Sequence, residues 1–115
     1  MKPRRVVVTG LGALTPIGNN ISSFWQGLIN GKSGAAPITY FDASKFKTHF
    51  ACEIKNFDPL NHFDRKEARK YDRFAQYALV STEEAIKDSK LDLEKIDKDR
   101  VGVIWGAGIG GLETF

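Results

Sequence analysis

The chain has 115 residues, of which 42% are hydrophobic and 27% charged, with a formal net charge of +3. This length predicts one domain, and the hydrophobic content excludes an intrinsically disordered chain. No apolar run approaches the ~20 residues needed to span a bilayer, and glycines and Pro16 interrupt any signal-peptide core. The mild charge, without an arginine-rich block, gives no indication of nucleic-acid binding. The single Cys52 fits a reducing compartment, so we expect a cytoplasmic protein.

The first eighteen residues predict the opening of an α/β domain. Three consecutive valines, Val6–Val8, predict a strand buried on both faces, which is typical of parallel sheets. Gly10 and Gly12 follow, and they permit backbone conformations or close contacts that a Cβ would block. Residues 15–18 (Thr-Pro-Ile-Gly) predict a turn. A strand that enters a glycine turn and then a helix is the start of an α/β unit.

The next segment predicts a capped helix and a weak strand. Asn20 is a good N-cap for a helix over Ile21–Ile29, whose apolar residues share one face, and Gly31 supplies the stop. Residues 32–42 predict a loop. His49–Ile54 alternates weakly and predicts a short strand.

The second half predicts a long helix and a second buried strand. The helix runs from about Arg65 to Ser89, and its alanines indicate close packing. The strand Arg100–Trp105 then enters the glycine loop 106–111. The order of strand, helix, weak strand, helix and strand predicts an α/β fold with right-handed crossovers. The chain ends at residues 112–115, where a helix is expected to begin, so we expect an N-terminal piece of a larger protein.

The glycine loop Gly106–Gly111 matches the spacing G-x-G-x-x-G after a predicted strand. One hypothesis is a dinucleotide site with a pyrophosphate at a helix N-terminus. The other is a tight strand-to-helix turn beside a different kind of site. An acidic residue about twenty positions later separates the two hypotheses, and that position lies beyond Phe115.

Cys52 is the one candidate nucleophile in the sequence. A catalytic cysteine needs a base or a positive field to form its thiolate, and His49 and His62 are near it only in sequence. The spacing of these three residues matches no metal-site pattern. We therefore expect Cys52 to be a buried small residue of a weak strand and expect no metal site.

Four cations follow helical spacing in the predicted long helix: Lys66, Arg69, Lys70 and Arg73 stand at i, i+3, i+4 and i+7. One hypothesis is a solvated helix face whose cations pair locally with Asp64, Glu67 and Asp72. The other is a docking surface for an acidic partner.

Several segments of this chain resemble the elongating β-ketoacyl-acyl-carrier-protein synthases, particularly the type II form. The segments are Arg4–Gly18, the Ser33-Gly34 loop continuing to Phe41-Asp42, Arg65–Phe74 with Gln76-Tyr77, and Gly106–Gly111. They occur in the family's order and spacing across the whole chain. The resemblance implies a thiolase-like α/β fold, layered αβαβα in the intact protein. Residues 1–115 are then the N-terminal part of the first α/β half, with no complete second domain.

The resemblance implies an acyltransferase, a 3-oxoacyl-carrier-protein synthase of fatty-acid biosynthesis. A cysteine accepts the acyl group, and decarboxylative condensation with malonyl-carrier protein follows, supported by two histidines. These residues lie beyond Phe115 in the family's order, so no catalytic residue is assigned and the isolated chain is expected to be inactive. The substrates travel on the phosphopantetheine arm of the acyl carrier protein, so no cofactor is expected. The implied partners are that carrier protein and a second copy in a homodimer, with neither nucleic acid nor membrane.

Site residues follow from the same resemblance. Lys66, Arg69 and Lys70 match the basic helix that such enzymes present to the acidic carrier protein, and Arg73 is added although the family does not require a cation there. Ile109 matches a residue lining the far end of the acyl-chain pocket across the dimer interface. Two alternatives stay open: a non-catalytic fragment that binds carrier protein, and a nucleotide-binding α/β domain that uses Gly106–Gly111.

Overall fold

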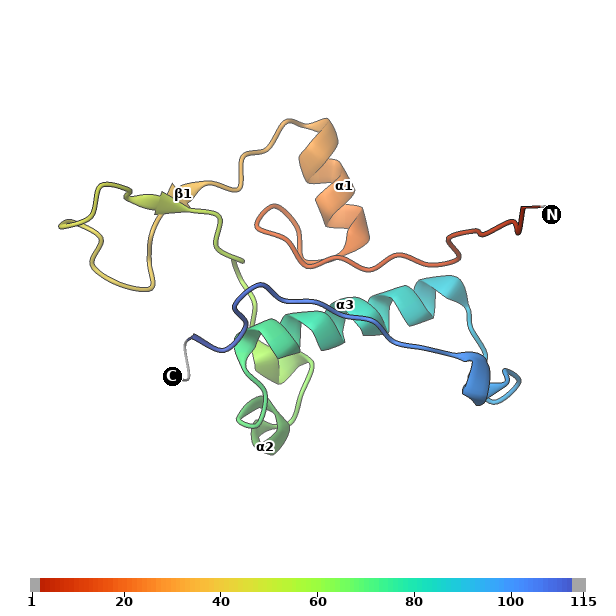
Figure 1. Ribbon diagram of the computed structural model, residues 1–115. Coiled ribbons are helices and arrows are strands. Elements are labelled where there is room, and N and C mark those ends of the chain that lie inside the picture. Colours follow the sequence, from red (N-terminus) through yellow and green to blue (C-terminus); the bar gives the residue numbers. More distant parts are fainter. Residues whose placement is uncertain (1–2, 113–115) are drawn as a thin grey trace.

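The helix α3 is the element around which the chain is arranged (Figure 1). The computed structural model describes residues 3–112. In chain order the elements are α1 (Ile21–Ile29), β1 (Ala36–Pro37), β2 (Phe50–Ala51), the 3₁₀ turn η1 (Pro59–Asn61), α2 (Arg65–Ala68), α3 (Arg73–Ser89) and the 3₁₀ turn η2 (Lys98–Arg100). Figure 1 shows α1 above α3, α2 below it, and the β1–β2 hairpin to the left. Residues 113–115, most of the segment where a further helix was expected, lie outside the described residues.

The predicted first helix is confirmed, together with both of its ends. Asn20 Oδ1 accepts from the N–H of Ser23 at 2.8 Å, and Ser23 Oγ accepts from the N–H of Asn20 at 3.2 Å. This reciprocal pair is a capping box, with Ser23 in the place of the usual Glu or Gln. Gly31, just after the C-cap Asn30, has φ of 62°, a left-handed conformation that costs glycine little.

The weak strand is confirmed in a shorter form. Only Phe50–Ala51 of the expected His49–Ile54 is a strand, and it pairs antiparallel with β1, in the register Ala36 to Ala51 and Pro37 to Phe50. The β1 strand falls inside the predicted loop 32–42, where two residues are too few to give a periodic signal.

The single long helix over Arg65–Ser89 is wrong, because the chain breaks it into α2 and α3. Asp64 caps α2 by accepting from the N–H groups of Lys66 and Glu67 at 2.8 and 2.7 Å, and α2 ends after one turn. Asp72 then takes the extended N-cap conformation before α3. Asp64 therefore caps a separate short helix through its side chain, whereas Asp72 precedes α3 without a side-chain cap hydrogen bond, and the one predicted helix becomes two.

The N-terminal segment lies with its backbone directly against α3. A Cβ on Gly12 would clash with the carbonyl oxygen of Ser81, and a Cβ on Gly10 with that of Ala85. Glu84 adds a polar link, since its carboxylate accepts from the N–H of Ala13 at 2.9 Å and from that of Ile21 at 2.8 Å. This confirms two expectations. The glycines permit close contacts, and the alanines of this helix accompany close packing.

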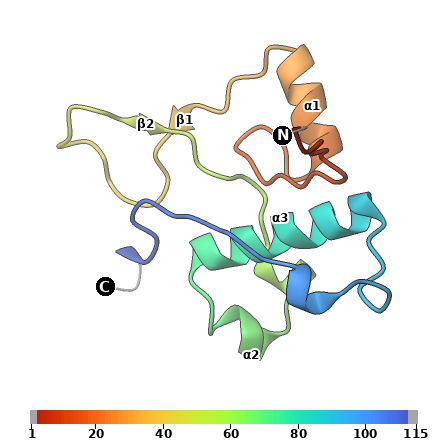
Figure 2. The ribbon, with the colours of Figure 1, turned by 45° about the vertical axis from the view of Figure 1, so that its right-hand side comes forward.

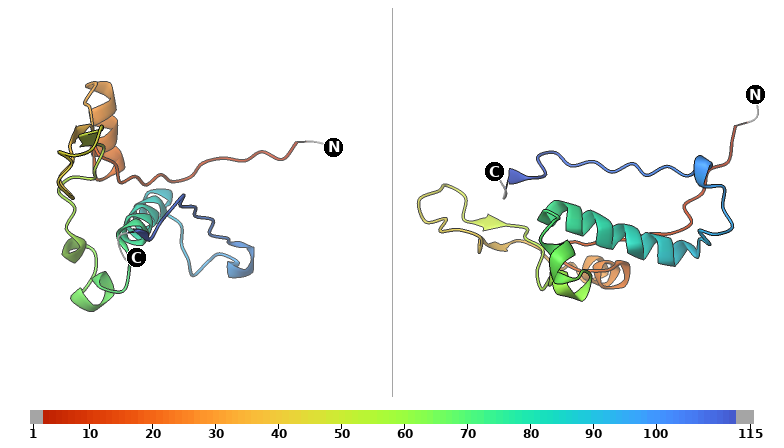
Figure 3. Two further views of the ribbon diagram at one scale, coloured as in Figure 1. Left: turned by 60° about the vertical axis from the view of Figure 1, so that its left-hand side comes forward. Right: turned by 90° about the horizontal axis from the view of Figure 1, so that it is seen from below.

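The two predicted buried strands are wrong for the described residues. Val6–Val8 and Val101–Trp105 are extended but belong to no sheet, and Val6 is 89% and Ile104 99% exposed. The two segments flank α3 (Figures 2 and 3). Residues 101–105, together with Thr9, Gly10 and Gly12 just after the valines, line a groove whose floor is Ser81, Thr82, Ala85 and Ile86. A strand needs a hydrogen-bonded neighbour, and within residues 3–112 neither segment has one.

The described chain is open in shape. Its accessible surface is 9873 Å², whereas a compact monomer of this length exposes roughly 6300 Å². Its radius of gyration is 17.5 Å, against about 13 Å for a compact domain of this length. The helices between residues 3 and 112 include none with the length and apolar character that crossing a bilayer requires.

We predict that the chain on its own associates through its exposed extended segments, because large exposed apolar surface favours contact with another molecule. The double change Val7→Lys with Ile104→Lys, at two exposed positions, should shift the chain toward monomer in sedimentation velocity and leave its helical circular dichroism unchanged.

Val80→Lys is the matched control, since Val80 is buried on α3 and the change should remove helical signal. A wild-type chain that sediments as a monomer and melts in one sharp transition would contradict the prediction.

Candidate functional site

The predicted cations lie on α2 and on the turn that follows it. Lys66 is on α2, Arg69 is its C-cap and Lys70 is in the turn, and all three are exposed. Arg65, the first residue of α2, adds a fourth exposed cation. We call Arg65, Lys66, Arg69 and Lys70 the basic cluster.

The basic cluster is not neutralised locally. None of its four cations forms an ion pair with an acidic side chain of residues 3–112; the ion pairs that occur there are Lys87–Glu83, Lys95–Asp92 and Lys98–Glu94. The nearby Asp64 instead accepts from backbone N–H groups. The hypothesis of local pairing with Asp64, Glu67 and Asp72 therefore finds no support in the described residues.

Sequence analysis missed two residues of this surface, Arg65 and Leu60. With Ala68 and Arg69 they line a shallow hollow of about 280 Å³, and Leu60 is half exposed. The signal for Arg65 was present, because Arg65 and Arg69 stand at i and i+4. Leu60 gave no signal, since η1 places it beside α2 only in three dimensions.

Arg73 differs from the other predicted cations in its surroundings. It is the first residue of α3, and its guanidinium carbon lies 5.9 Å from the centre of the Tyr40 ring, a cation–π distance. It does not share a helix face with Lys66, Arg69 and Lys70, because the break at residues 69–72 ends α2 before α3 begins.

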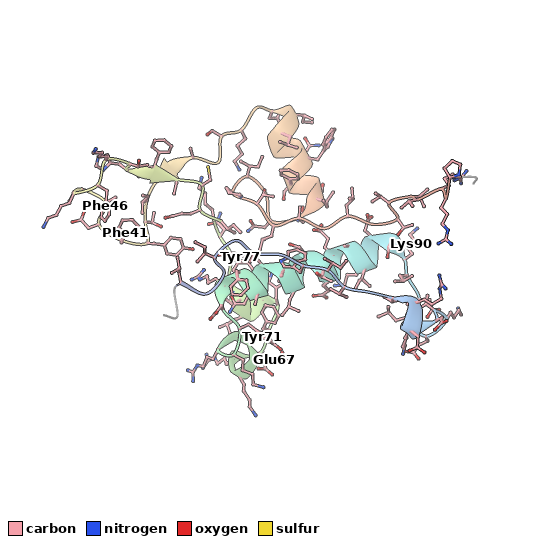
Figure 4. The ribbon with its side chains drawn as sticks, in the orientation of Figure 1. Phe41, Phe46, Glu67, Tyr71, Tyr77 and Lys90 are labelled. Atoms are coloured by element: carbon pink, nitrogen blue, oxygen red, sulfur yellow. The ribbon has the colours of Figure 1, made fainter. Side chains whose placement is uncertain are left out.

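We call residues 57–71, which contain η1 and α2, the α2 lobe. Aromatic rings hold this lobe against α3. Phe57 meets Tyr77 edge to face at 5.1 Å and stacks on His62 at 5.6 Å, while Phe63 lies 6.0 Å from Tyr71. Figure 4 shows Glu67 and Tyr71 on the lobe below α3, with Tyr77 on α3 itself. Edge-to-face and stacked ring pairs add about 0.5–1.5 kcal/mol each beyond their buried area, so they help to fix where the basic cluster stands.

Ile109 lines a larger hollow of about 410 Å³ near the N-terminal end of α3. The wall is formed by apolar and aromatic residues with a few polar ones: Tyr40, Ala51, Cys52, Glu53, Ile54, Asp72, Arg73, Phe74, Tyr77, Gly110 and Leu112. The Ile109 side chain is 76% exposed. A Cβ on Gly110 would lie 2.8 Å from the Phe74 ring, so this glycine lets the loop approach α3. The structure therefore brings Ile109 and Arg73 to one hollow.

Glu53 is an acidic group in the wall of this hollow. Thr39 donates to its carboxylate from its hydroxyl at 2.6 Å and from its N–H at 3.0 Å. These bonds, the hydroxyl first, lower the pKa of Glu53, so this residue carries its charge at neutral pH.

Neither a nucleophile site nor a metal site is assembled in the described part of the chain. The expected burial of Cys52 is wrong: Cys52 is exposed, because it follows a two-residue strand that pairs only with β1 in the described residues. No histidine lines the hollow that contains it. Within residues 3–112 no three side chains of His, Cys, Asp or Glu lie close enough together to share a metal ion. The glycine loop is followed by no described helix, and Gly106 and Gly108 stand in open space. A helix after this loop would lie beyond the described residues, so the dinucleotide site stays a hypothesis.

Comparison with known proteins identifies the family. The family described as "Beta-ketoacyl synthase, N-terminal domain" matches residues 3–114. A 3-oxoacyl-[acyl-carrier-protein] synthase 2 of Staphylococcus aureus is 49% identical over 112 residues, which are 97% of this chain and 27% of that protein. The enzyme of the same name from Synechocystis sp. is 49% identical over 115 residues, or 100% of this chain and 28% of that protein. The chain thus spans about a quarter of the length of these relatives.

Solved structures give the same result for the fold. The ishigamide ketosynthase/chain length factor superposes with a TM-score of 0.68 at 35% identity, covering 81% of this chain and 23% of that one. A type II PKS acyl-carrier protein in complex with its ketosynthase gives a TM-score of 0.59 at 28% identity, covering 79% of this chain and 23% of that one. The described fold is the N-terminal portion of a thiolase-like α/β fold. The chain belongs to the β-ketoacyl synthase family, and its residues 3–114 match the model of that family's N-terminal domain.

Proposed function

We propose that this chain is the N-terminal part of an elongating β-ketoacyl-acyl-carrier-protein synthase. The reaction is decarboxylative condensation of an enzyme-bound acyl group with malonyl-carrier protein, in type II fatty-acid biosynthesis. The observation that carries the proposal is the identity of 49% with 3-oxoacyl-[acyl-carrier-protein] synthases over nearly the whole chain. The unpaired basic cluster is consistent with a substrate delivered on an acidic protein.

Within this proposal the basic cluster receives the acyl carrier protein. Its cations outnumber the neighbouring Asp64 and Glu67 and form no ion pair with an acidic side chain of residues 3–112, so approaching carboxylates meet a net positive surface. Such charges chiefly raise the association rate and set the orientation of docking. Support comes also from the solved ketosynthase neighbour, which is bound to its own acyl-carrier protein. Arg73, held over Tyr40, is a candidate for the edge of the docking surface.

The hollow beside Ile109 is the candidate end of an acyl-chain pocket. Its wall contains the apolar side chains of Ile54, Phe74 and Ile109, and an acyl chain gains free energy by leaving water for such surroundings. We assign no catalytic residue and no metal or cofactor to this chain. The cysteine and histidines implied by the resemblance lie beyond residue 115, and the substrates arrive on the phosphopantetheine arm of the carrier protein. We also propose that the intact protein is a homodimer in the cytoplasm.

The test uses a full-length ketosynthase with this chain as its N-terminal segment, completed where necessary with the remainder of the Staphylococcus aureus relative. We predict that Lys66→Glu with Arg69→Glu raises the KM for carrier-bound substrate about tenfold at low salt. An exposed ion pair contributes roughly 0.2–1 kcal/mol, and reversal replaces attraction by repulsion at two positions. Turnover of small thioester analogues should stay within twofold, and the difference should fade as salt is added.

Lys95→Glu with Lys98→Glu is the matched control, because it makes the same change in net charge at cations outside the basic cluster. An equal effect of both double variants would refute carrier docking at the basic cluster. If the full-length protein does not condense acyl groups but still binds carrier protein, the function is that of a non-catalytic binding module.

The position of Ile109 predicts a dependence on chain length. Replacing Ile109 with Phe adds volume to the wall of the hollow, and overpacking costs roughly 1–3 kcal/mol. A short acyl primer that stops before this wall avoids the cost, whereas a long primer must displace the ring. We expect Ile109→Phe to lower kcat/KM for long primers tenfold or more, which corresponds to about 1.4 kcal/mol, and to leave short primers within twofold.

Measurement of kcat/KM across a series of primer lengths shows whether the loss in Ile109→Phe depends on chain length. Ile29→Phe is the control, since Ile29 is an exposed residue of α1 that does not line this hollow. A uniform loss at every primer length would mean that Ile109 supports the fold and does not bound the pocket.

A further inference from the structure

Gln76 is a polar side chain that α3 buries against the turn leading into it, with only 5% of the residue exposed. Its amide nitrogen Nε2 donates to the carbonyl oxygen of Ala68 at 2.8 Å and to that of Tyr71 at 2.9 Å. These carbonyls stand on either side of Arg69 and Lys70 in the sequence. One amide group therefore fixes both ends of the segment that carries two cations of the basic cluster.

The orientation of this amide is determined by its two acceptors. Turned by half a rotation, it would place Oε1 against two carbonyl oxygens, which offer no proton. In the observed orientation Oε1 is buried and has no hydrogen-bond partner in residues 3–112. An unmet buried acceptor disfavours the folded state, so an apolar side chain would better suit a position that only packs. What distinguishes Gln76 is the pair of hydrogen bonds it gives to the turn.

The aromatic contacts with α3 join side chains, whereas the backbone hydrogen bonds of Arg69 and Lys70 run to α2. The N–H groups of Arg69 and Lys70 both donate to the carbonyl oxygen of Glu67, which ties the turn to α2. The α2 helix has four residues, and a helix of one turn has no stability of its own. Gln76 thus connects the segment directly to the seventeen-residue α3.

We propose that Gln76 is a positioning residue for carrier-protein docking. It holds the backbone at Arg69 and Lys70 so that both cations are in place before the acidic partner arrives. Without its two hydrogen bonds the turn becomes ordered only on binding, which weakens the complex. This inference rests on the proposed function of the basic cluster.

The test compares Gln76→Met with wild type in the full-length ketosynthase. Methionine keeps the length of the side chain and removes both donors. We expect KM for carrier-bound substrate to rise three- to tenfold at low salt, with kcat and the kinetics of small thioesters within twofold. Gln26→Met, at an exposed glutamine of α1, should change none of these values. If Gln76→Met does not fold, Gln76→Asn replaces it, because its shorter amide cannot span both carbonyls, and the same pattern is expected.

A double-mutant cycle separates positioning from general stability. If Gln76 acts through the basic cluster, Gln76→Met adds less than twofold to KM in a background of Arg69→Ala with Lys70→Ala. Equal losses for carrier-bound and small substrates, or full additivity with that background, would overturn the inference. If Arg69→Ala with Lys70→Ala leaves the carrier KM unchanged, carrier docking at the basic cluster itself fails. If Arg69→Ala with Lys70→Ala raises the carrier KM but Gln76→Met leaves it unchanged, the basic cluster still binds the carrier protein and Gln76 does not position it.

Discussion

The close approach of residues 10–12 to α3 is the constraint on which the described fold depends. Backbone meets backbone there, which is possible because Gly10 and Gly12 have no Cβ to hold the segments apart. Glu84 then joins the loop after these glycines and the first turn of α1 to the same helix, through the N–H groups of Ala13 and Ile21. The rest of the chain is placed by α3 as well, since the α2 lobe packs on it through Phe57 and Tyr77.

The break between α2 and α3 separates Arg73 from the other three predicted cations. On one helix, the four predicted cations would form a single charged stripe. The break instead leaves Lys66, Arg69 and Lys70 on a separate lobe and seats Arg73 over Tyr40 at the larger hollow. The surface proposed for the carrier protein and the hollow proposed for the acyl chain thus lie at opposite ends of one four-residue turn. A protein partner and the chain it delivers would meet the enzyme on either side of that turn.

Sequence reasoning succeeded where the signal is local. The capping residue Asn20 and the left-handed Gly31 bound α1 correctly, because each acts on its own neighbours. It failed where the outcome depends on distant residues. Val6–Val8 have the composition of a buried strand, but burial needs neighbouring strands that residues 3–112 do not provide. The break before α3 was missed because the helical spacing of the cations continues across Asp72 and because Gln76 acts across the turn. Leu60 joins the basic cluster only through the packing of η1 beside α2.

The hydrogen bonds of Glu84 have a consequence for synthesis of the protein. They join residues 71 and 63 positions apart, so the N-terminal loop cannot complete them until α3 has left the ribosome. At translation rates of about 5–20 residues per second, the N–H group of Ala13 waits roughly 4–14 seconds for Glu84. During this interval the N–H groups of Ala13 and Ile21 lack the carboxylate that accepts from them in the mature fold, so the loop between them is not yet held in place. The same contacts that organise the mature fold therefore make its beginning vulnerable while the chain is being made.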